Sequence, residues 1–108
     1  MAAKGCANLE EVRERIDALD RELVGLLADR FAYARQAAAF KVSVADVPAP
    51  ERVAKVIGNV RRLAEEAGAP PEGVEAVYRA LIDAMIRLEL DLHEKTATAG
   101  GAGLKKQL

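Results

Sequence analysis

Cysteine and histidine are almost missing from this sequence, and their scarcity excludes several kinds of site. The 108 residues include one cysteine, Cys6, and one histidine, His93. One thiol cannot form an internal disulfide, and one thiol with one imidazole cannot supply the ligands of a zinc site. A Ser-His or Cys-His relay would depend on His93 alone. We therefore expect no metal site and no nucleophilic relay.

Long apolar runs and a large net charge are also missing. No stretch reaches the roughly 18 apolar residues of a membrane span, and residues 1–6 lack the apolar core of a signal peptide. The formal net charge of −1 provides no general attraction to nucleic acid or to an anionic membrane. We expect a cytoplasmic protein with neither partner, in which a few local cations bind any anion.

What the sequence does contain favours an all-α fold, because Ala, Leu, Glu and Arg lose little side-chain freedom in a helix. The longest predicted helix begins at Asn8, where Asn8 and Glu11 form a variant of the capping box, and ends near Phe40. At 1.5 Å per residue it would be about 50 Å long. The apolar residues that recur along it at helical spacing are Leu9, Val12, Ile16, Leu19, Leu23, Leu26, Leu27, Ala34, Ala37 and Phe40.

Two shorter helices follow the first. Pro50 suits the first turn of a helix, where its missing N–H has no helical partner, and Gly68 suits the cap after Ala67. The third helix follows a Pro-Pro connection and is expected to end near Lys95. The chain is thus predicted to contain three helices.

The predicted organisation is one helical domain, residues 8–95, followed by a flexible Gly- and Ala-rich tail, residues 96–108. Partner helices of about 27 and 38 Å cannot cover a helix of about 50 Å and also pack together. The uncovered apolar surface would mark an interface, and an intertwined helical homodimer would bury it. On pattern alone, a plain coiled coil or an elongated three-helix bundle is the alternative.

Charged residues stand in or beside the apolar stripes of the predicted helices. They are Arg13, Arg30, Lys41, Arg52 and Glu89. Burying several charges is costly, and a group of cations with one acid is the electrostatic outline of a site for a small polyanion. Arg13 lies about 25 Å from Arg30 along one helix, so only an antiparallel partner helix could bring Arg13 of a second chain to that site.

Each of these residues also has a purely structural interpretation. Arg13 could belong to a solvated helix face, and Arg30 could extend from the edge of the bundle into water. Glu89 could form a core salt bridge with Arg52 or Arg30. Lys41 could complement the dipole at the end of the first helix.

The charged residues stand within an ordered series of short motifs. These are Leu9-x-x-Val12-Arg13-x-x-Ile16-Asp17-x-x-Asp20, Leu26-Leu27-Ala28-x-Arg30, Phe40-Lys41 and Val47-Pro48-Ala49-Pro50-Glu51-Arg52-Val53. The series resembles the all-helical chorismate mutase family (chorismate mutase type II), with local similarity to isochorismate-pyruvate lyase, a member of that fold. The resemblance implies an intertwined dimer with two sites, each completed by an arginine from the neighbouring chain.

The resemblance also implies a role for each charged residue. Arg13 would be the arginine donated across the dimer, while Arg30 and Arg52 would hold the two carboxylate regions of a dicarboxylate substrate. Lys41 would approach the ether oxygen and a carboxylate. Glu89 stands beside that oxygen, where bacterial members usually have Gln. Lys41, Glu89 and Arg30 are therefore the expected catalytic residues.

The implied reaction is the cofactor-free rearrangement of chorismate to prephenate. Negative charge grows on the ether oxygen as its C–O bond breaks, so a cation and a hydrogen-bond donor there stabilise the transition state. Glu89 can donate only when protonated, so we expect activity to fall as pH rises. Met85, by pattern a core residue of the third helix, is also expected to contact the substrate.

Other functions stay open at this point. Many members have a Glu that binds the substrate hydroxyl where this chain has Val53. Isochorismate-pyruvate lyase, which forms salicylate and pyruvate, shares that loss. A related aminochorismate mutase is a further alternative. From a different class, the chain could be a non-catalytic helical dimer that binds an aromatic metabolite, although the retention of four site cations argues against it.

Overall fold

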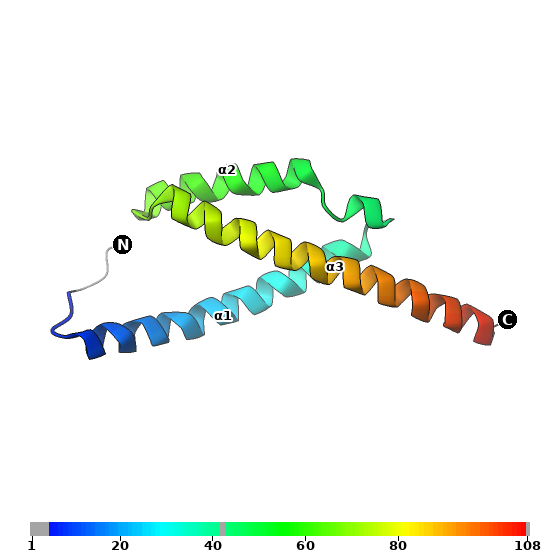
Figure 1. Cartoon of the computed structure of the whole chain (residues 1–108), viewed down its shortest axis with the longest axis horizontal. Helices are drawn as coiled ribbons and strands as arrows, with labels where there is room; N and C mark the ends of the chain where they lie inside the picture. The colour runs from blue at the N-terminus through cyan, green and yellow to red at the C-terminus, as the bar shows by residue number, and fades with distance from the viewer. Residues whose placement is uncertain (1–4, 42, 108) are drawn as a thin grey trace.

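A computed structural model describes residues 5–41 and 43–107, with side-chain surroundings described through residue 94. These residues form three α-helices and a short 3-10 helix, and none of them lies in a strand (Figure 1). The elements in chain order are α1 (Leu9–Ala39), η1 (Val44–Asp46), α2 (Pro50–Ala67) and α3 (Pro71–Gln107). The predicted all-α chain of three helices, with a long N-terminal helix, is confirmed.

Helix α1 begins at the predicted cap. The backbone N–H of Glu11 donates to Oδ1 of Asn8 at 2.8 Å, which satisfies one of the free donors in the first turn. The carboxylate of Glu11 in turn accepts from the backbone N–H of Ala7 at 3.4 Å, one residue earlier than in a standard capping box. The helix ends at Ala39, and the N–H of Phe40 donates to the carbonyl of Ala37 at 3.0 Å.

Helices α2 and α3 form an antiparallel hairpin, and their facing sides supply most of the buried core (Figure 1). Pro50 is the first residue of α2, as predicted. Gly68 follows its last residue with a φ of 77°, a left-handed conformation that glycine adopts without strain. The buried apolar residues are Ile57, Val60, Ala64, Ile82 and Met85 of this hairpin, with Ala38 and Val47.

The connection between α1 and α2 contains η1, which the sequence pattern did not predict because a single turn is too short to show periodicity. Val47 follows η1 and is only 1% exposed, so it anchors the connection to the core. Ala49 has a φ of 40°, in the left-handed region, directly before Pro50. A non-glycine residue in this region costs on the order of 1–3 kcal/mol, so the surrounding packing must hold it there.

Helix α3 is longer than expected. It continues past Lys95 to Gln107, so no helix end marks the boundary drawn there from the sequence. The flexibility of the tail stays a prediction, and residue 108 lies outside the described residues. None of the helices in the described part of the chain has both the length and the apolar character needed to cross a membrane.

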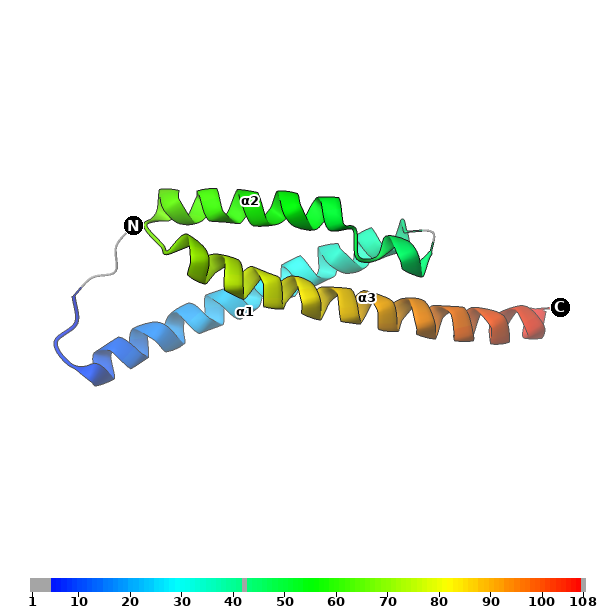
Figure 2. The same ribbon diagram turned by 45° about the horizontal axis from the view of Figure 1, so that its top comes forward.

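Helix α1 leaves most of its apolar side exposed. It crosses α3 near its own C-terminal end, while its N-terminal half extends away from the hairpin (Figures 1 and 2). Ala38 is the one buried residue within α1. The exposed apolar residues that we call the α1 stripe are Leu9, Val12, Ile16, Leu19, Leu23, Leu26, Tyr33 and Phe40. The single chain therefore does not cover its long first helix.

Ion pairs fasten α2 to the start of α3. Arg61 of α2 donates to Glu75 at 2.7 Å and to Glu72 at 3.3 Å, and Arg79 donates to Glu75 at 2.7 Å. The hydrogen bonds from Arg79 and Arg61 hold the pKa of Glu75 below its usual range. The pKa of Glu72 is lowered by a backbone hydrogen bond and by Arg61. The ion pairs between α2 and α3 are therefore strongest when Glu72 and Glu75 are ionised.

We expect Glu75→Gln to lower the melting temperature by a few degrees at neutral pH and to have little effect in strong acid. The folded pKa of Glu75 lies below its unfolded value of about 4.3. Its ionised form therefore stabilises the fold fully above the unfolded pKa, and this contribution is lost as pH falls through the folded pKa. Circular-dichroism melts between about pH 7 and pH 2 measure the difference. An equal loss at neutral pH in Glu65→Gln, an exposed acid of α2, would contradict this expectation.

Candidate functional site

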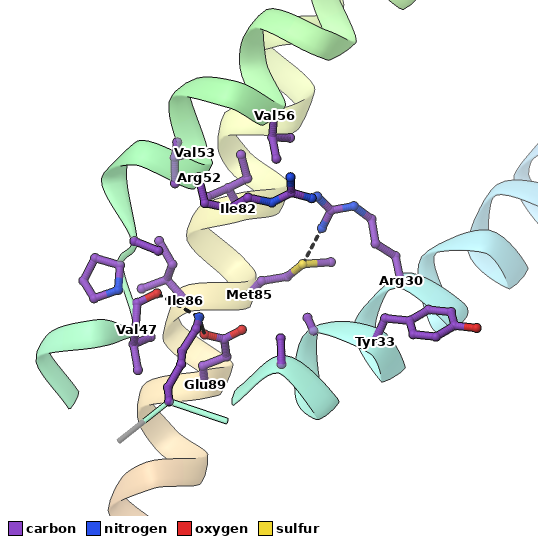
Figure 3. A pocket seen from close by; sticks show the side chains of 15 residues that line it. Arg30, Tyr33, Val47, Arg52, Val53, Val56, Ile82, Met85, Ile86 and Glu89 are labelled. Atoms are coloured by element: carbon purple, nitrogen blue, oxygen red, sulfur yellow. Dashed lines mark hydrogen bonds and ion pairs between the residues drawn. The ribbon is translucent and has the colours of Figure 1, made fainter. Parts of the chain in front are cut away.

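A cavity of about 300 Å³ lies where the end of α1, the α1–α2 connection, the start of α2 and the middle of α3 meet (Figure 3). Its volume is at the lower end of the range for small-molecule sites. The residues that line it are Arg30, Tyr33, Ala34, Ala37, Lys41, Val47, Pro48, Ala49, Arg52, Val53, Val56, Ile82, Met85, Ile86 and Glu89. Segments that are distant in the sequence thus line one cavity.

Five of the six residues singled out from the sequence line this cavity. They are Arg30, Lys41, Arg52, Met85 and Glu89. The sixth, Arg13, lies on an exposed turn of α1, about 25 Å along the helix from Arg30. A single chain therefore brings together three of the four cations, and Arg13 is not one of them.

Lys41 and Glu89 form an ion pair at one end of the cavity. Nζ of Lys41 lies 2.7 Å from Oε2 of Glu89 and donates to the carbonyl of Val47 at 3.2 Å. The side chains are 22% and 8% exposed, respectively. The sequence suggested Arg30 or Arg52 as the partner of Glu89, whereas the ion pair forms with Lys41. An ammonium has three donors, so one N–H of Lys41 is available beyond these two bonds.

Arg30 is held from two sides by α3. Its Nη1 donates to Sδ of Met85 at 2.6 Å, and its Cζ lies 5.5 Å from the ring centroid of Tyr78. Met85 is buried, and Arg30 is half-buried. A cation within about 6 Å of an aromatic face is attracted by the ring quadrupole. The guanidinium is therefore oriented before any ligand binds.

Arg52 reaches the cavity from the first turn of α2. In the close-up, the guanidinium ends of Arg30 and Arg52 point toward one another from opposite sides (Figure 3). Two like charges that face each other favour an anion between them, and guanidinium groups bind carboxylates with two parallel hydrogen bonds. This end of the cavity is suited to a carboxylate ligand.

The remaining walls are mostly apolar. They include Val47, Val53, Val56, Ile82 and Ile86. Three cations and one acid beside such walls leave a net positive charge at the site, with Arg52 exposed and Arg30 and Lys41 half-buried. No Ser, Cys or His is among the lining residues. The site can therefore hold a compact apolar anion and act on it through fixed charges and hydrogen-bond donors.

Two contributors to the site were missed at the level of sequence. The carbonyl of Val47, which accepts from Lys41, is a backbone group and leaves no signal in a residue pattern. Tyr78, which the sequence analysis does not single out, has its ring beneath the guanidinium of Arg30. The sequence offered one signal: Tyr78 and Met85 are about two helical turns apart and therefore lie on the same side of α3.

Comparisons with known proteins agree with this chemistry. Residues 12–90 match the family model for chorismate mutase type II. The chain is 36% identical over 94 residues to the isochorismate pyruvate lyase of Pseudomonas aeruginosa, a match that covers 87% of this chain and 93% of that protein. It is 32% identical over 91 residues to the T-protein of Enterobacter agglomerans, covering 83% of this chain but 24% of that longer relative.

We expect Lys41→Met to lower the free energy of unfolding by about 2–4 kcal/mol, because it leaves the 8% exposed carboxylate of Glu89 without its cation. The double variant Lys41→Met/Glu89→Gln removes that stranded charge as well and should recover most of the loss. Urea unfolding of the wild type, both single variants and the double variant measures the effect. A double variant no more stable than Lys41→Met would show that the ion pair does not contribute in this way.

Proposed function

This chain belongs to the chorismate mutase type II family, and on that premise we propose that its cavity rearranges chorismate to prephenate without a cofactor. The observation that carries the proposal is the convergence of Arg30, Lys41 and Arg52 on one small, mainly apolar cavity. Chorismate is a compact ring with two carboxylates and an ether oxygen, so it presents the anionic and apolar groups that this cavity complements.

The proposed binding mode uses the two guanidinium groups first. Arg30 and Arg52 hold carboxylate groups, and the apolar walls formed by Val53 and Ile82 enclose the ring. Holding the side chain of the substrate over its ring selects the folded conformer that reacts. This lowers the entropic part of the barrier, because the reacting carbon atoms are already close together.

In the proposed chemical step the ether C–O bond breaks while a new C–C bond forms, and negative charge develops on the oxygen. The available N–H of Lys41 stabilises that charge. Glu89 accepts from Lys41 when ionised and adds a second hydrogen bond to the oxygen only in its protonated form. These interactions strengthen as the charge grows, so they favour the transition state over the bound substrate. Nothing in the step requires a covalent intermediate.

The second candidate is elimination of pyruvate from isochorismate to give salicylate. The match to an isochorismate pyruvate lyase over 93% of its length favours it, and so do the apolar Ala49 and Val53 beside Arg52. This reaction breaks the corresponding C–O bond, so Lys41 would stabilise charge on the same oxygen. The two substrates differ in the position of the ring hydroxyl. The rearrangement forms a C–C bond, whereas in the elimination a ring hydrogen moves to the enolpyruvyl methylene as the C–O bond breaks, so that pyruvate leaves and the ring becomes aromatic.

We also propose that the active form is a homodimer in which α1 packs against α1 of a second chain. The α1 stripe is too extensive for the single chain to cover. Its residues alternate at spacings of three and four from Leu9 to Leu26 and continue at spacings of seven, as in a coiled-coil seam. In an antiparallel arrangement, Arg13 of the partner approaches the cavity near Arg30. The donated cation would complete the set expected from the sequence.

A paired assay of the purified protein tests the reaction. We expect fast loss of chorismate, followed by ultraviolet absorbance, and slow formation of fluorescent salicylate from isochorismate. The reverse pattern would establish the lyase, and activity with neither substrate would favour a non-catalytic binding protein. Repeating the assay across pH with Glu89→Gln tests the role of that acid: wild-type activity should fall as pH rises, and the variant should show a flatter profile.

Hybrid dimers test the shared site. Arg13→Ala and Lys41→Met chains, each nearly inactive, should regain about a quarter of wild-type activity when they are unfolded together and refolded. A hybrid combines the intact cavity of one chain with Arg13 of the other, and about half of randomly formed dimers are hybrids. Light scattering after size exclusion confirms the dimer, and Arg15→Ala is a nearby control that should stay active alone. Failure to recover activity in verified hybrids would exclude donation of Arg13.

A further inference from the structure

Tyr78 lies outside the lining of the cavity, yet its ring contacts a residue that forms the cavity wall. The Cζ atom of Arg30 is 5.5 Å from the centroid of the Tyr78 ring. Tyr78 belongs to α3, whereas Arg30 belongs to α1, so the contact joins two helices that meet over a short length. Tyr78 is half-buried, so water surrounds this contact less than it would on an open surface.

Arg30 needs such support because an arginine side chain has many rotamers. From α1 it must extend across to the face of α3 to reach the cavity. Met85 contacts one guanidinium nitrogen through Sδ, a weak acceptor. With this one contact the plane of the guanidinium can still rotate. A second contact, between the guanidinium and the face of the Tyr78 ring, restricts that rotation. Tyr78 and Met85 lie about two turns apart on the same side of α3 and provide this pair of contacts.

We infer that Tyr78 is a positioning residue for the reaction, which orients Arg30 toward the substrate carboxylate through the face of its ring. This inference rests on the proposed function, because it assigns to Arg30 the binding of a carboxylate. The part of Tyr78 that acts is the aromatic face, and its hydroxyl group is not required. Orientation before binding reduces the entropy lost when the carboxylate is bound.

The role of the ring is tested by comparing Tyr78→Phe with Tyr78→Leu. Tyr78→Phe keeps the aromatic face and should keep KM within about twofold of the wild type. Tyr78→Leu keeps an apolar side chain without a π face and should raise KM about fivefold, equivalent to about 1 kcal/mol. Its kcat should change little, because Arg30 binds the carboxylate in both the bound substrate and the transition state. Val77→Ala, at the exposed neighbouring position, is the control for changes in α3 and should leave KM unchanged.

A double-variant comparison separates orientation of Arg30 from general support of the fold. In the Arg30→Gln background, Tyr78→Leu should cause no further rise in KM, because the group that it positions is already missing. An equal rise in both backgrounds, or equal effects of Tyr78→Leu and Tyr78→Phe, would overturn the inference. If Tyr78→Leu does not fold, phenylalanine analogues with increasing ring fluorination at position 78 keep the shape and weaken the negative face. KM should then rise with fluorination, and a constant KM would overturn the inference.

Failure of the proposed function would be visible separately. If the wild type converts neither chorismate nor isochorismate, the proposed function is wrong. Urea unfolding of the wild type, Tyr78→Leu, Arg30→Gln and the double variant still tests the contact between Tyr78 and Arg30. Tyr78→Leu should shift the unfolding midpoint less in the Arg30→Gln background than in the wild type. Equal shifts in the two backgrounds would show that Tyr78 and Arg30 are not coupled, whatever the reaction.

Discussion

The arrangement of the segments around the cavity depends on the ion pair between Lys41 and Glu89. It joins the end of α1 to the middle of α3, and the bond from Lys41 to the carbonyl of Val47 adds the connecting segment. Farther along α1, Arg30 makes the other polar contact with α3, through Met85. The ion pair therefore brings three segments of the chain together at one end of the cavity and fixes the position of Lys41 there.

Charge balance is the property of the cavity that the two candidate reactions have in common. Glu89 offsets one of the three cations, and the two guanidinium groups remain available for carboxylates. Both candidate reactions release charge onto an ether oxygen and need little more than a cation nearby and a fixed substrate conformation. Under either proposal the substrate would be distinguished by the walls, where the side chain of Val53 has no hydrogen-bonding group for a ring hydroxyl. If the cations stabilise charge and the walls select the substrate, substitutions in the walls can change the reaction without loss of the cations.

Local features were predictable from the sequence, and long-range pairings were not. The ends of α2 follow from Pro50 and Gly68, whose backbone preferences act within one turn of the chain. The charges at positions 30, 41, 52 and 89 stood out because an apolar stripe makes a charged residue conspicuous. The partner of Glu89 and the ring beneath Arg30 depend on how far each helix is rotated where they cross. The spacing of residues within one helix does not predict how that helix is rotated relative to another.

The continuity of α1 also limits how the sequence of this protein can change. The helix runs without a break from its cap at Asn8 past Arg13 and Arg30, and the α1 stripe shares this one register. Removing or adding a single residue between the two arginines would turn one relative to the other by about 100° and shift it by about 1.5 Å. The stripe would then no longer form a single seam. If the proposed dimer uses this seam, the length of α1 between these arginines is fixed by it, whereas the connections are not constrained in this way.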